Sequence, residues 1–129
     1  MKVENIKFKA KRLDNGEWII GSFVVMKIPA LSKTTIGIVA EGGATLHEVD
    51  PSTVCQFTGL KDCEDKEVWE GDIVRDTEDL LGIDNLYEVV YIEEEGNFAF
   101  KSLDKVDNYE PFVNLFNACV VGNKFDKEK

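Results

Sequence analysis

The sequence lacks several features that define whole classes of protein. It has no apolar run of about 18 residues, so we expect no membrane-spanning helix. The N-terminal stretch MKVENIKFKAKRL alternates charged and apolar residues and has no apolar core of a signal peptide, which predicts a cytoplasmic protein. Histidine occurs once, at His47, and no close pair of ligands accompanies it, which argues against a zinc site.

Cysteine is also scarce. The three residues, Cys55, Cys63 and Cys119, are odd in number, and no two of them form a C-x-x-C pair. This pattern fits a reducing compartment, where thiols stay unpaired. We therefore expect ordinary thiols at all three positions and predict no cofactor.

A catalytic constellation is missing as well. His47 lies beside Glu48 and near Asp50, with Cys55 and Cys63 further along the chain. Nucleophilic catalysis requires a cysteine, a histidine and an acid within hydrogen-bond reach of one another, and sequence proximity does not provide that. An exposed loop histidine is the simpler interpretation, so we predict that the protein is not an enzyme.

Two acidic clusters have simple explanations. The first lacks the glycine and the closing glutamate of a calcium loop, so no metal is predicted there; it comprises Asp62, Glu64, Asp65 and Glu67. The second, Glu93-Glu94-Glu95, fits a solvated hairpin tip. The flanking aromatic residues have no interleaved Lys or Arg, so they predict a core or interface face and not a platform for bases; they are Tyr87, Tyr91, Phe98 and Phe100.

The charge is unevenly distributed along the chain. Residues 1–63 carry 8 Lys/Arg against 7 Asp/Glu, whereas residues 64–129 carry 7 against 18. A surface as acidic as the second half repels phosphate, so nucleic-acid binding there is disfavoured. The acidity has two interpretations, of which solubility is the simpler and contact with a basic protein partner the more specific.

The first twelve residues have the opposite charge balance, because five basic residues face only Glu4; they are Lys2, Lys7, Lys9, Lys11 and Arg12. Such a basic arm is one candidate for contact with nucleic acid. The lysines alternate with Ile6, Phe8 and Ala10, however, which is typical of a half-buried strand. We favour an edge strand whose lysines deter mispairing.

The N-terminal half predicts a β-hairpin. Asn15-Gly16 lies between residues 6–13 and 17–26 and is a strong turn signal, because both residues tolerate positive φ. The second strand is nearly all apolar, so we expect it to be central and covered on both faces. Gly21 within it indicates a bulge or a close approach of backbones. Residues 27–47 are expected to form a loop with one short strand at residues 36–40.

The C-terminal half predicts further short strands, at residues 54–58, 73–75, 87–92, 97–102 and 118–125. Gly59 is expected to end the first of these, and residues 103–118 to form a turn that plugs the core. The fold class is therefore mainly β, or β-rich α+β. We expect an N-terminal β-hairpin region over residues 1–60, joined to a small SH3-like barrel over residues 61–129.

Several segments match one known family. They are Ile6-Lys7-Phe8-Lys9-Ala10, Gly16-Glu17-Trp18, residues 49–54 (VDPSTV), residues 56–62 (QFTGLKD) and residues 69–74 (WEGDIV). In this order they resemble the YopX family of bacterial and phage proteins across nearly the whole chain. The family often has Lys-Asn-Gly in the turn where this chain has Cys63-Glu64-Asp65, so the geometry of that turn is not carried over.

The resemblance implies a phage or prophage origin and a β-rich domain that self-associates, but it implies no reaction and no catalytic residue. Six motif residues are expected to act structurally: Gln56, Gly59, Leu60, Trp69, Gly71 and Asp72. We expect Gly59 and Gly71 to take backbone conformations that a side chain would penalise, Leu60 and Trp69 to pack the turn, and Asp72 to accept hydrogen bonds from nearby amides.

The functional hypothesis is an accessory protein, encoded by a phage or prophage, that works in the cytoplasm of a bacterial host by protein–protein binding or self-assembly. Nucleic acid and membrane are not expected as partners. The alternative is a nucleic-acid-binding protein that uses the basic N-terminal arm.

Overall fold

The computed structural model describes residues 2–76, 85–103, 109–111 and 118–126, and within them the chain is mainly β. These residues form eleven strands and three short 3-10 helices, with no α-helix among them. None of the helices in this part of the chain is long and apolar enough to cross a membrane. The chain divides into two compact units, Met1–Phe57 and Thr58–Lys129, whereas the boundary expected from the sequence lies after residue 60.

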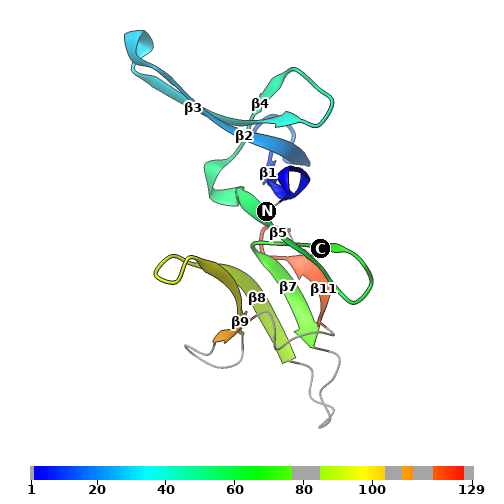
Figure 1. Cartoon of the computed structure of the whole chain (residues 1–129). Coiled ribbons are helices and arrows are strands. Elements are labelled where there is room, and N and C mark those ends of the chain that lie inside the picture. Colours follow the sequence, from blue (N-terminus) through cyan, green and yellow to red (C-terminus); the bar gives the residue numbers. More distant parts are fainter. Residues whose placement is uncertain (1, 77–84, 104–108, 112–117, 127–129) are drawn as a thin grey trace. The chain divides into compact units, whose positions relative to one another are not determined.

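The N-terminal unit is built around a twisted antiparallel sheet (Figure 1). Its strands are β1 (Phe8–Lys11), β2 (Trp18–Ile28), β3 (Lys33–Ala40), β4 (Leu46–Glu48) and the first residues of β5 (Cys55–Lys61), in the order β4-β3-β2-β1-β5. The 3-10 helices are η1 (Val3–Asn5), η2 (Pro29–Leu31) and η3 (Pro51–Thr53). Strand β5 crosses the boundary between the units and is also the neighbour of β6.

The predicted N-terminal hairpin is confirmed. Residues Phe8–Lys11 pair with residues 18–21 of β2, and Gly16 has φ +72° in the connecting turn. The N–H of Arg12 donates to the carbonyl of Glu17 over 2.9 Å, and the N–H of Gly16 donates to the carbonyl of Arg12 over 2.9 Å. The turn therefore closes where the Asn-Gly pair predicts it.

Three expectations for this unit are wrong. Strand β1 is not an edge strand, because it pairs with β2 on one side and with β5 on the other. Strand β2 is central but is not covered on both faces, since Ser22, Val25 and Met26 are exposed. Residues 27–47 are not a loop with one short strand, because β3 runs from Lys33 to Ala40 and β4 follows it. The threonines and isoleucines of β3 suit an extended backbone, and pairing with β2 lengthens the strand.

The core of the N-terminal unit is one cluster of apolar side chains, contributed by its strands and by the segment after β4. Ala10, Ile19, Ile38 and Val49 are buried there, with Phe8, Phe23, Ile36, Ala40 and Val54 packed against them. An antiparallel bridge joins Arg12 to Val49, and the N–H of Asp50 donates to the carbonyl of Lys11 over 2.9 Å. The N–H of Lys11 donates to Oγ1 of Thr53 over 2.9 Å. The turn after β4 thereby covers the second edge of β1.

The C-terminal unit contains a second antiparallel sheet. Its strands are β7 (Asp72–Asp76), β8 (Asn85–Ile92), β9 (Asn97–Ser102), β10 (Tyr109–Pro111) and β11 (Ala118–Asn123), in the order β10-β9-β8-β7-β11; β6 (Glu67–Trp69) pairs with β5 instead. The predicted hairpin of residues 87–92 and 97–102 is confirmed, from Tyr87 opposite Ser102 to Ile92 opposite Asn97. The buried core comprises Val68, Val74, Tyr87, Val89, Phe100 and Ala118. Most of the plug expected over residues 103–118 lies outside the described residues.

Candidate functional site

The motif residues lie in β5 and β7 and in the segment between them. Gln56 pairs opposite Phe8. Gly59 and Gly71 each have φ +86°, which confirms the expectation that both glycines take a conformation that a side chain would penalise. Gly59 does not end the strand, because β5 continues through it to Lys61. Trp69 is buried as expected, but Leu60 is 47% exposed, so its predicted packing role is wrong. The last three residues of β5 are all exposed, and Leu60 is one of them.

Asp72 organises the sharp turn between β6 and β7. Asp72 is 2% exposed, and its side chain accepts hydrogen bonds from the N–H of Trp69 over 2.8 Å and from Nδ2 of Asn123 over 2.9 Å. Oδ1 of Asn123 in turn accepts from the N–H of Phe125 over 2.9 Å. The N–H of Gly71 donates to the carbonyl of Val89 over 2.7 Å. The expected role of Asp72 as an acceptor is confirmed, and this buried network ties β6, β7 and the end of β11 together.

A second carboxylate, Asp62, holds the loop between β5 and β6 against β11. Oδ1 of Asp62 accepts from the N–H groups of Glu64 and Lys66, each over 2.8 Å. Oδ2 accepts from the N–H of Val120, also over 2.8 Å. Burial alone would raise the pKa of this carboxyl group, but the three backbone donors outweigh burial, so the pKa lies below its usual value.

The lowered pKa of Asp62 predicts a pH dependence of stability. Because the folded pKa is depressed, the charge of Asp62 stabilises the fold fully above the unfolded pKa, near 3.8, and this contribution is lost as the pH falls through the folded value. We expect the difference in unfolding free energy between the wild type and Asp62→Asn to be largest near neutral pH and to shrink below pH 3.8. Urea denaturation across this range measures it, and a constant difference would contradict the assignment.

The expectation of three ordinary thiols is wrong for two of them. Cys63, in the β5–β6 loop, and Cys119, on β11, form a disulfide with a Cα–Cα distance of 5.4 Å. The residues are 56 positions apart, and the N–H of Cys63 donates to the carbonyl of Ala118 over 3.2 Å. Spacing alone could not reveal this pair, because it depends on β11 returning beside the loop. Cys55 is buried and outside this disulfide, and its Sγ lies 3.2 Å from the carbonyl oxygen of Thr53.

One group of potential metal ligands occurs among residues 2–76, 85–103, 109–111 and 118–126. Ligand atoms of Cys63, Glu64 and Cys119 all lie within 4.8 Å of one another. His47 is outside this group; it lies on β4 opposite Ile38 and lines a hollow of about 330 Å³.

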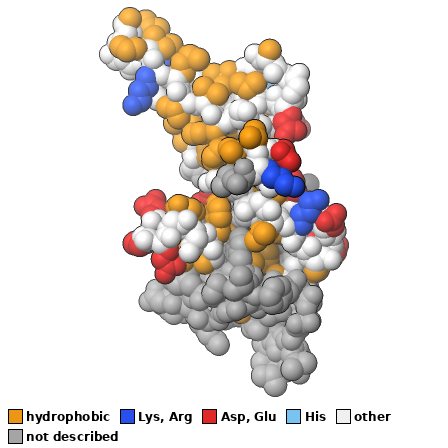
Figure 2. Space-filling model, in the orientation of Figure 1, with side chains coloured by type: hydrophobic (Ala, Val, Ile, Leu, Met, Phe, Trp, Pro, Cys, Tyr) orange, Lys and Arg blue, Asp and Glu red, His pale blue; other side chains and the backbone are white. Residues whose placement is uncertain are grey.

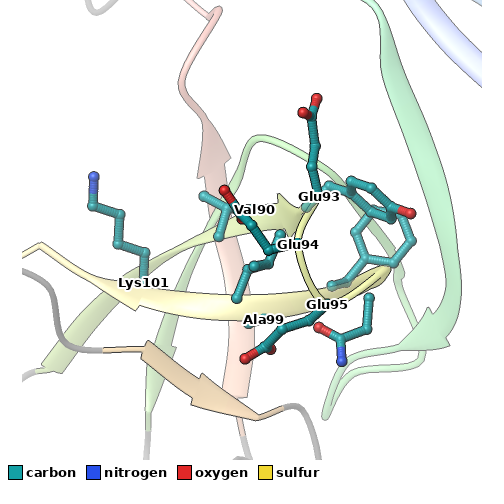
Figure 3. A pocket seen from close by; sticks show the side chains of 10 residues that line it. Val90, Glu93, Glu94, Glu95, Ala99 and Lys101 are labelled. Carbon is teal, nitrogen blue, oxygen red and sulfur yellow. The ribbon is translucent and has the colours of Figure 1, made fainter.

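The β8–β9 hairpin carries a larger groove of about 740 Å³ (Figure 3). The acidic turn, Glu93, Glu94 and Glu95, lies at one end, and Lys101 lies at the other. Apolar residues line the space between; they include Val90, Tyr91, Ile92, Phe98 and Ala99. Tyr91 and Phe98 meet edge to face with ring centroids 5.2 Å apart, and Tyr91 is 42% exposed. This is an apolar groove with an acidic end.

The lysines of β1 lie over aromatic rings. Nζ of Lys9 is 4.6 Å, and Nζ of Lys11 5.3 Å, from the centre of the Trp18 ring. Nζ of Lys7 is 4.7 Å from the centre of the Phe57 ring. Cation–π attraction of this kind stabilises a lysine against a ring. The alternation of lysine and apolar residues in this strand therefore produces a face where cations cover aromatic side chains.

A family model described as "YopX protein" matches residues 7–128, nearly the whole chain. The chain belongs to the YopX family. The resemblance carried by the sequence motifs is thereby confirmed. The crystal structure of protein EF1440 from Enterococcus faecalis is similar to this chain, with 22% sequence identity, coverage of 92% of each chain and a TM-score of 0.49. No curated protein matches the chain.

Sequence reasoning missed three features of this YopX family protein: the disulfide, the role of Asp62 and the extent of the β2–β3 hairpin. The Asp62 signal was present, because an aspartate at the start of a tight turn often accepts hydrogen bonds from amides two or more residues on. The hairpin signal was weaker, because Pro29 lies in the middle of it, and a proline favours the end of a strand followed by a loop. The disulfide left no local signal.

Proposed function

We propose that this YopX family protein is an accessory protein, encoded by a phage or prophage, that acts in the cytoplasm of its bacterial host by protein–protein binding, and that its partner is a second copy of the chain. The observation that carries the proposal is the outer part of the β2–β3 hairpin, residues 24–36, which we call the hairpin arm. It combines exposed apolar side chains with unpaired strand edges.

The hairpin arm extends beyond its neighbouring strands (Figure 1). Among the described residues, β1 pairs with β2 only as far as Gly21, and β4 pairs with β3 only at residues 37–39. Among those residues, 24–28 and 33–35 therefore have only each other as strand partners, whereas the carbonyl of Ile36 accepts from the N–H of Val49 over 3.1 Å. A two-stranded ribbon is marginally stable in water, and unpaired edges are templates for adding a strand.

The side chains of the hairpin arm are unusually apolar for an exposed ribbon. Val25 is 49% exposed, Met26 45% and Leu31 68%. Figure 2 shows apolar atoms gathered over this part of the N-terminal unit. An apolar surface of this kind marks an interaction site when it is continuous.

Charge complementarity argues for a second copy as the partner. The only charged residues of the hairpin arm are Lys27 and Lys33, and no acidic residue lies between Glu17 and Glu41. The C-terminal unit, residues 58–129, carries 19 Asp/Glu against 8 Lys/Arg. Its groove on the β8–β9 hairpin joins apolar walls to three glutamates, whose acidic cluster is visible in Figure 2. An arm with apolar and basic residues fits that groove in another molecule.

Contact between an arm and a groove is heterologous, so it generates a ring or an open chain of subunits. We expect the full-length protein to oligomerise with increasing concentration and to dissociate partly as salt rises, since exposed charges are screened. Size-exclusion chromatography with light scattering measures both effects. A wild type that stays monomeric at every concentration would overturn the self-assembly proposal.

The decisive variant is Val25→Ser/Met26→Ser, which removes apolar contact from the hairpin arm and should shift the protein to monomer. The matched control is Leu60→Ser/Val121→Ser, because these two residues are 47% and 49% exposed and lie outside arm and groove. Glu93→Gln/Glu94→Gln/Glu95→Gln should weaken assembly from the groove side. If Val25→Ser/Met26→Ser assembles like the wild type, docking through the arm is contradicted. It is also contradicted if Leu60→Ser/Val121→Ser loses assembly to the same extent.

The face formed by the β1 lysines supports a second candidate, single-stranded nucleic-acid binding. Lys7, Lys9 and Lys11 lie against the rings of Trp18 and Phe57, and cations interleaved with aromatics are typical of surfaces that bind single strands. For this candidate, fluorescence anisotropy with an oligonucleotide should show binding that falls steeply with salt and disappears in Lys7→Ala/Lys9→Ala/Lys11→Ala. No binding at low salt would dismiss it.

We also propose that the C-terminal unit has the SH3-like arrangement expected from its sequence. The strand order supports this, because the last strand, β11, returns beside β7 and the strands β7, β8 and β9 form a meander. Amide contacts in an NMR spectrum across the gap between β10 and β11 would indicate a closed barrel. Their absence would leave an open sheet.

A further inference from the structure

The loop between β5 and β6 meets β11 at a cluster of three ligand-type side chains. Cys63 and Glu64 come from the loop and Cys119 from the strand, and their ligand atoms lie within 4.8 Å of one another. Cys63 and Glu64 are exposed and Cys119 is half-buried, so the cluster is open to solvent.

The two sulfur atoms are held near each other by contacts other than their own bond. On one side of Cys119, the carbonyl of Ala118 accepts from the N–H of Cys63 over 3.2 Å. On the other side, the N–H of Val120 donates to Oδ2 of Asp62 over 2.8 Å. These hydrogen bonds fix the strand to the loop directly before and after Cys119. After reduction of the disulfide, they keep both thiols facing one point.

The loop itself is also fixed. The N–H of Asp62 donates to the carbonyl of Lys66 over 2.7 Å, and Oδ1 of Asp62 holds the N–H groups of Glu64 and Lys66. Asp65 takes the left-handed conformation that closes the turn, with φ +66°. Within the described part of the chain, the Glu64 carboxylate forms an exposed ion pair with Lys66 at 3.7 Å, and such pairs contribute little. The Glu64 carboxylate is therefore free to turn toward the sulfurs at low cost.

We propose that Cys63, Glu64 and Cys119 form a redox-gated site for a thiophilic divalent cation such as Zn²⁺. Two thiolates and a carboxylate are zinc ligands, and thiolates select zinc over magnesium or calcium. The three side chains leave a fourth position for water. The disulfide closes the site, and reduction opens it. This inference does not depend on the proposed self-assembly.

The chemistry balances with a dithiol as reductant. The dithiol gives two electrons and two protons to the S–S bond, which becomes two thiols, and is itself converted to a disulfide. Binding of Zn²⁺ then displaces one proton from each thiol, and both protons go to solvent. In a reducing cytoplasm the cation would replace the covalent link, because it would again join the loop to β11. The cross-link would therefore persist in both redox states.

The test uses the full-length protein and Co²⁺ as a spectroscopic substitute for Zn²⁺. After reduction with a phosphine, titration should produce thiolate-to-cobalt charge-transfer absorption that saturates at one ion per chain and is abolished by Zn²⁺. The oxidised wild type is the folded control and should give no such band. Zn²⁺ should also raise the Tm of the reduced protein and leave that of the oxidised protein unchanged.

Single substitutions test the contribution of each of the three ligands to Co²⁺ binding. Cys63→Ser and Cys119→Ser should each abolish the charge-transfer band of a two-thiolate site, and Glu64→Gln should weaken Co²⁺ binding by about tenfold or more. Cys55→Ala is the thiol control and Glu93→Gln the carboxylate control, and both should bind like the wild type. Circular dichroism checks that each variant is folded. A reduced wild type without the band, or Glu64→Gln with unchanged affinity, would overturn the three-ligand site.

Discussion

Gly21→Ala should destabilise the N-terminal unit by about 3 kcal/mol or more, which is at the upper end of the range for single substitutions. Gly21 lies in β2 opposite Ala40 of β3. A Cβ atom at this position would overlap the carbonyl oxygen of Val39 and lie 2.8 Å from its carbonyl carbon and 2.9 Å from Cα of Ala40. These atoms are backbone, so no side chain can rotate away, and the two strands must separate to make room.

The measurement is urea denaturation followed by circular dichroism, with amide hydrogen exchange read by peptide to locate the loss. Faster exchange should be confined to peptides from β2 and β3. Gly122→Ala is the matched control, because it also places a methyl group in a strand glycine but meets no atom within 4 Å. Its free energy of unfolding should change by no more than about 0.5 kcal/mol. A tolerated Gly21→Ala would show that β2 and β3 do not approach as closely as the structure has them.

Asp72→Asn should destabilise the C-terminal unit by about 2 kcal/mol, because it places two amide groups face to face. In the wild type, Asp72 accepts from Trp69 and from Nδ2 of Asn123. The asparagine keeps one acceptor for the N–H of Trp69, but its own amide hydrogens then oppose those of Asn123. The two facing NH₂ groups, at positions 72 and 123, are then buried without an acceptor between them.

The double variant Asp72→Asn/Asn123→Asp should recover roughly half or more of that loss, since coupled neighbours are not additive. Asp at position 123 accepts from the new amide at position 72 and still accepts from the N–H of Phe125. The N–H of Phe125 and the new amide at position 72 then each have an acceptor. Equilibrium urea denaturation of the wild type, both single variants and the double variant completes the cycle. A double variant that is merely the sum of the two single losses would contradict the assigned hydrogen bonds.

The N-terminal hairpin and the β8–β9 hairpin could be predicted from the sequence because local chemistry specifies both. Asn15-Gly16 suits a tight turn, and the alternation of Tyr87, Val89 and Tyr91 sets which face of β8 points inward. The positive φ at Gly59 and Gly71 was predictable for the same reason, since glycine takes that conformation without a Cβ penalty. Family membership was likewise carried by short motifs in a fixed order.

The length of the hairpin arm could not be predicted locally. Pro29 indicated the end of a strand, and it does end β2, but η2 turns the chain straight into β3. Whether residues 33–36 form a strand depends on pairing with residues 25–28, and periodicity in one segment contains no information about its partner. The same reason explains β1, whose alternation predicts a strand but not that β5 would cover its second edge.

The sequence by itself determined that this chain is mainly β, where its two tight hairpins turn, that it belongs to the YopX family and that its acidic residues gather in the second half. Only the tertiary structure decided the partners: Cys119 for Cys63, Val120 for Asp62, Asn123 for Asp72. The members of each pair are more than 50 positions apart. Such contacts exist because β11 returns beside β7, and the order of strands in a sheet is set by global packing, which no local pattern records.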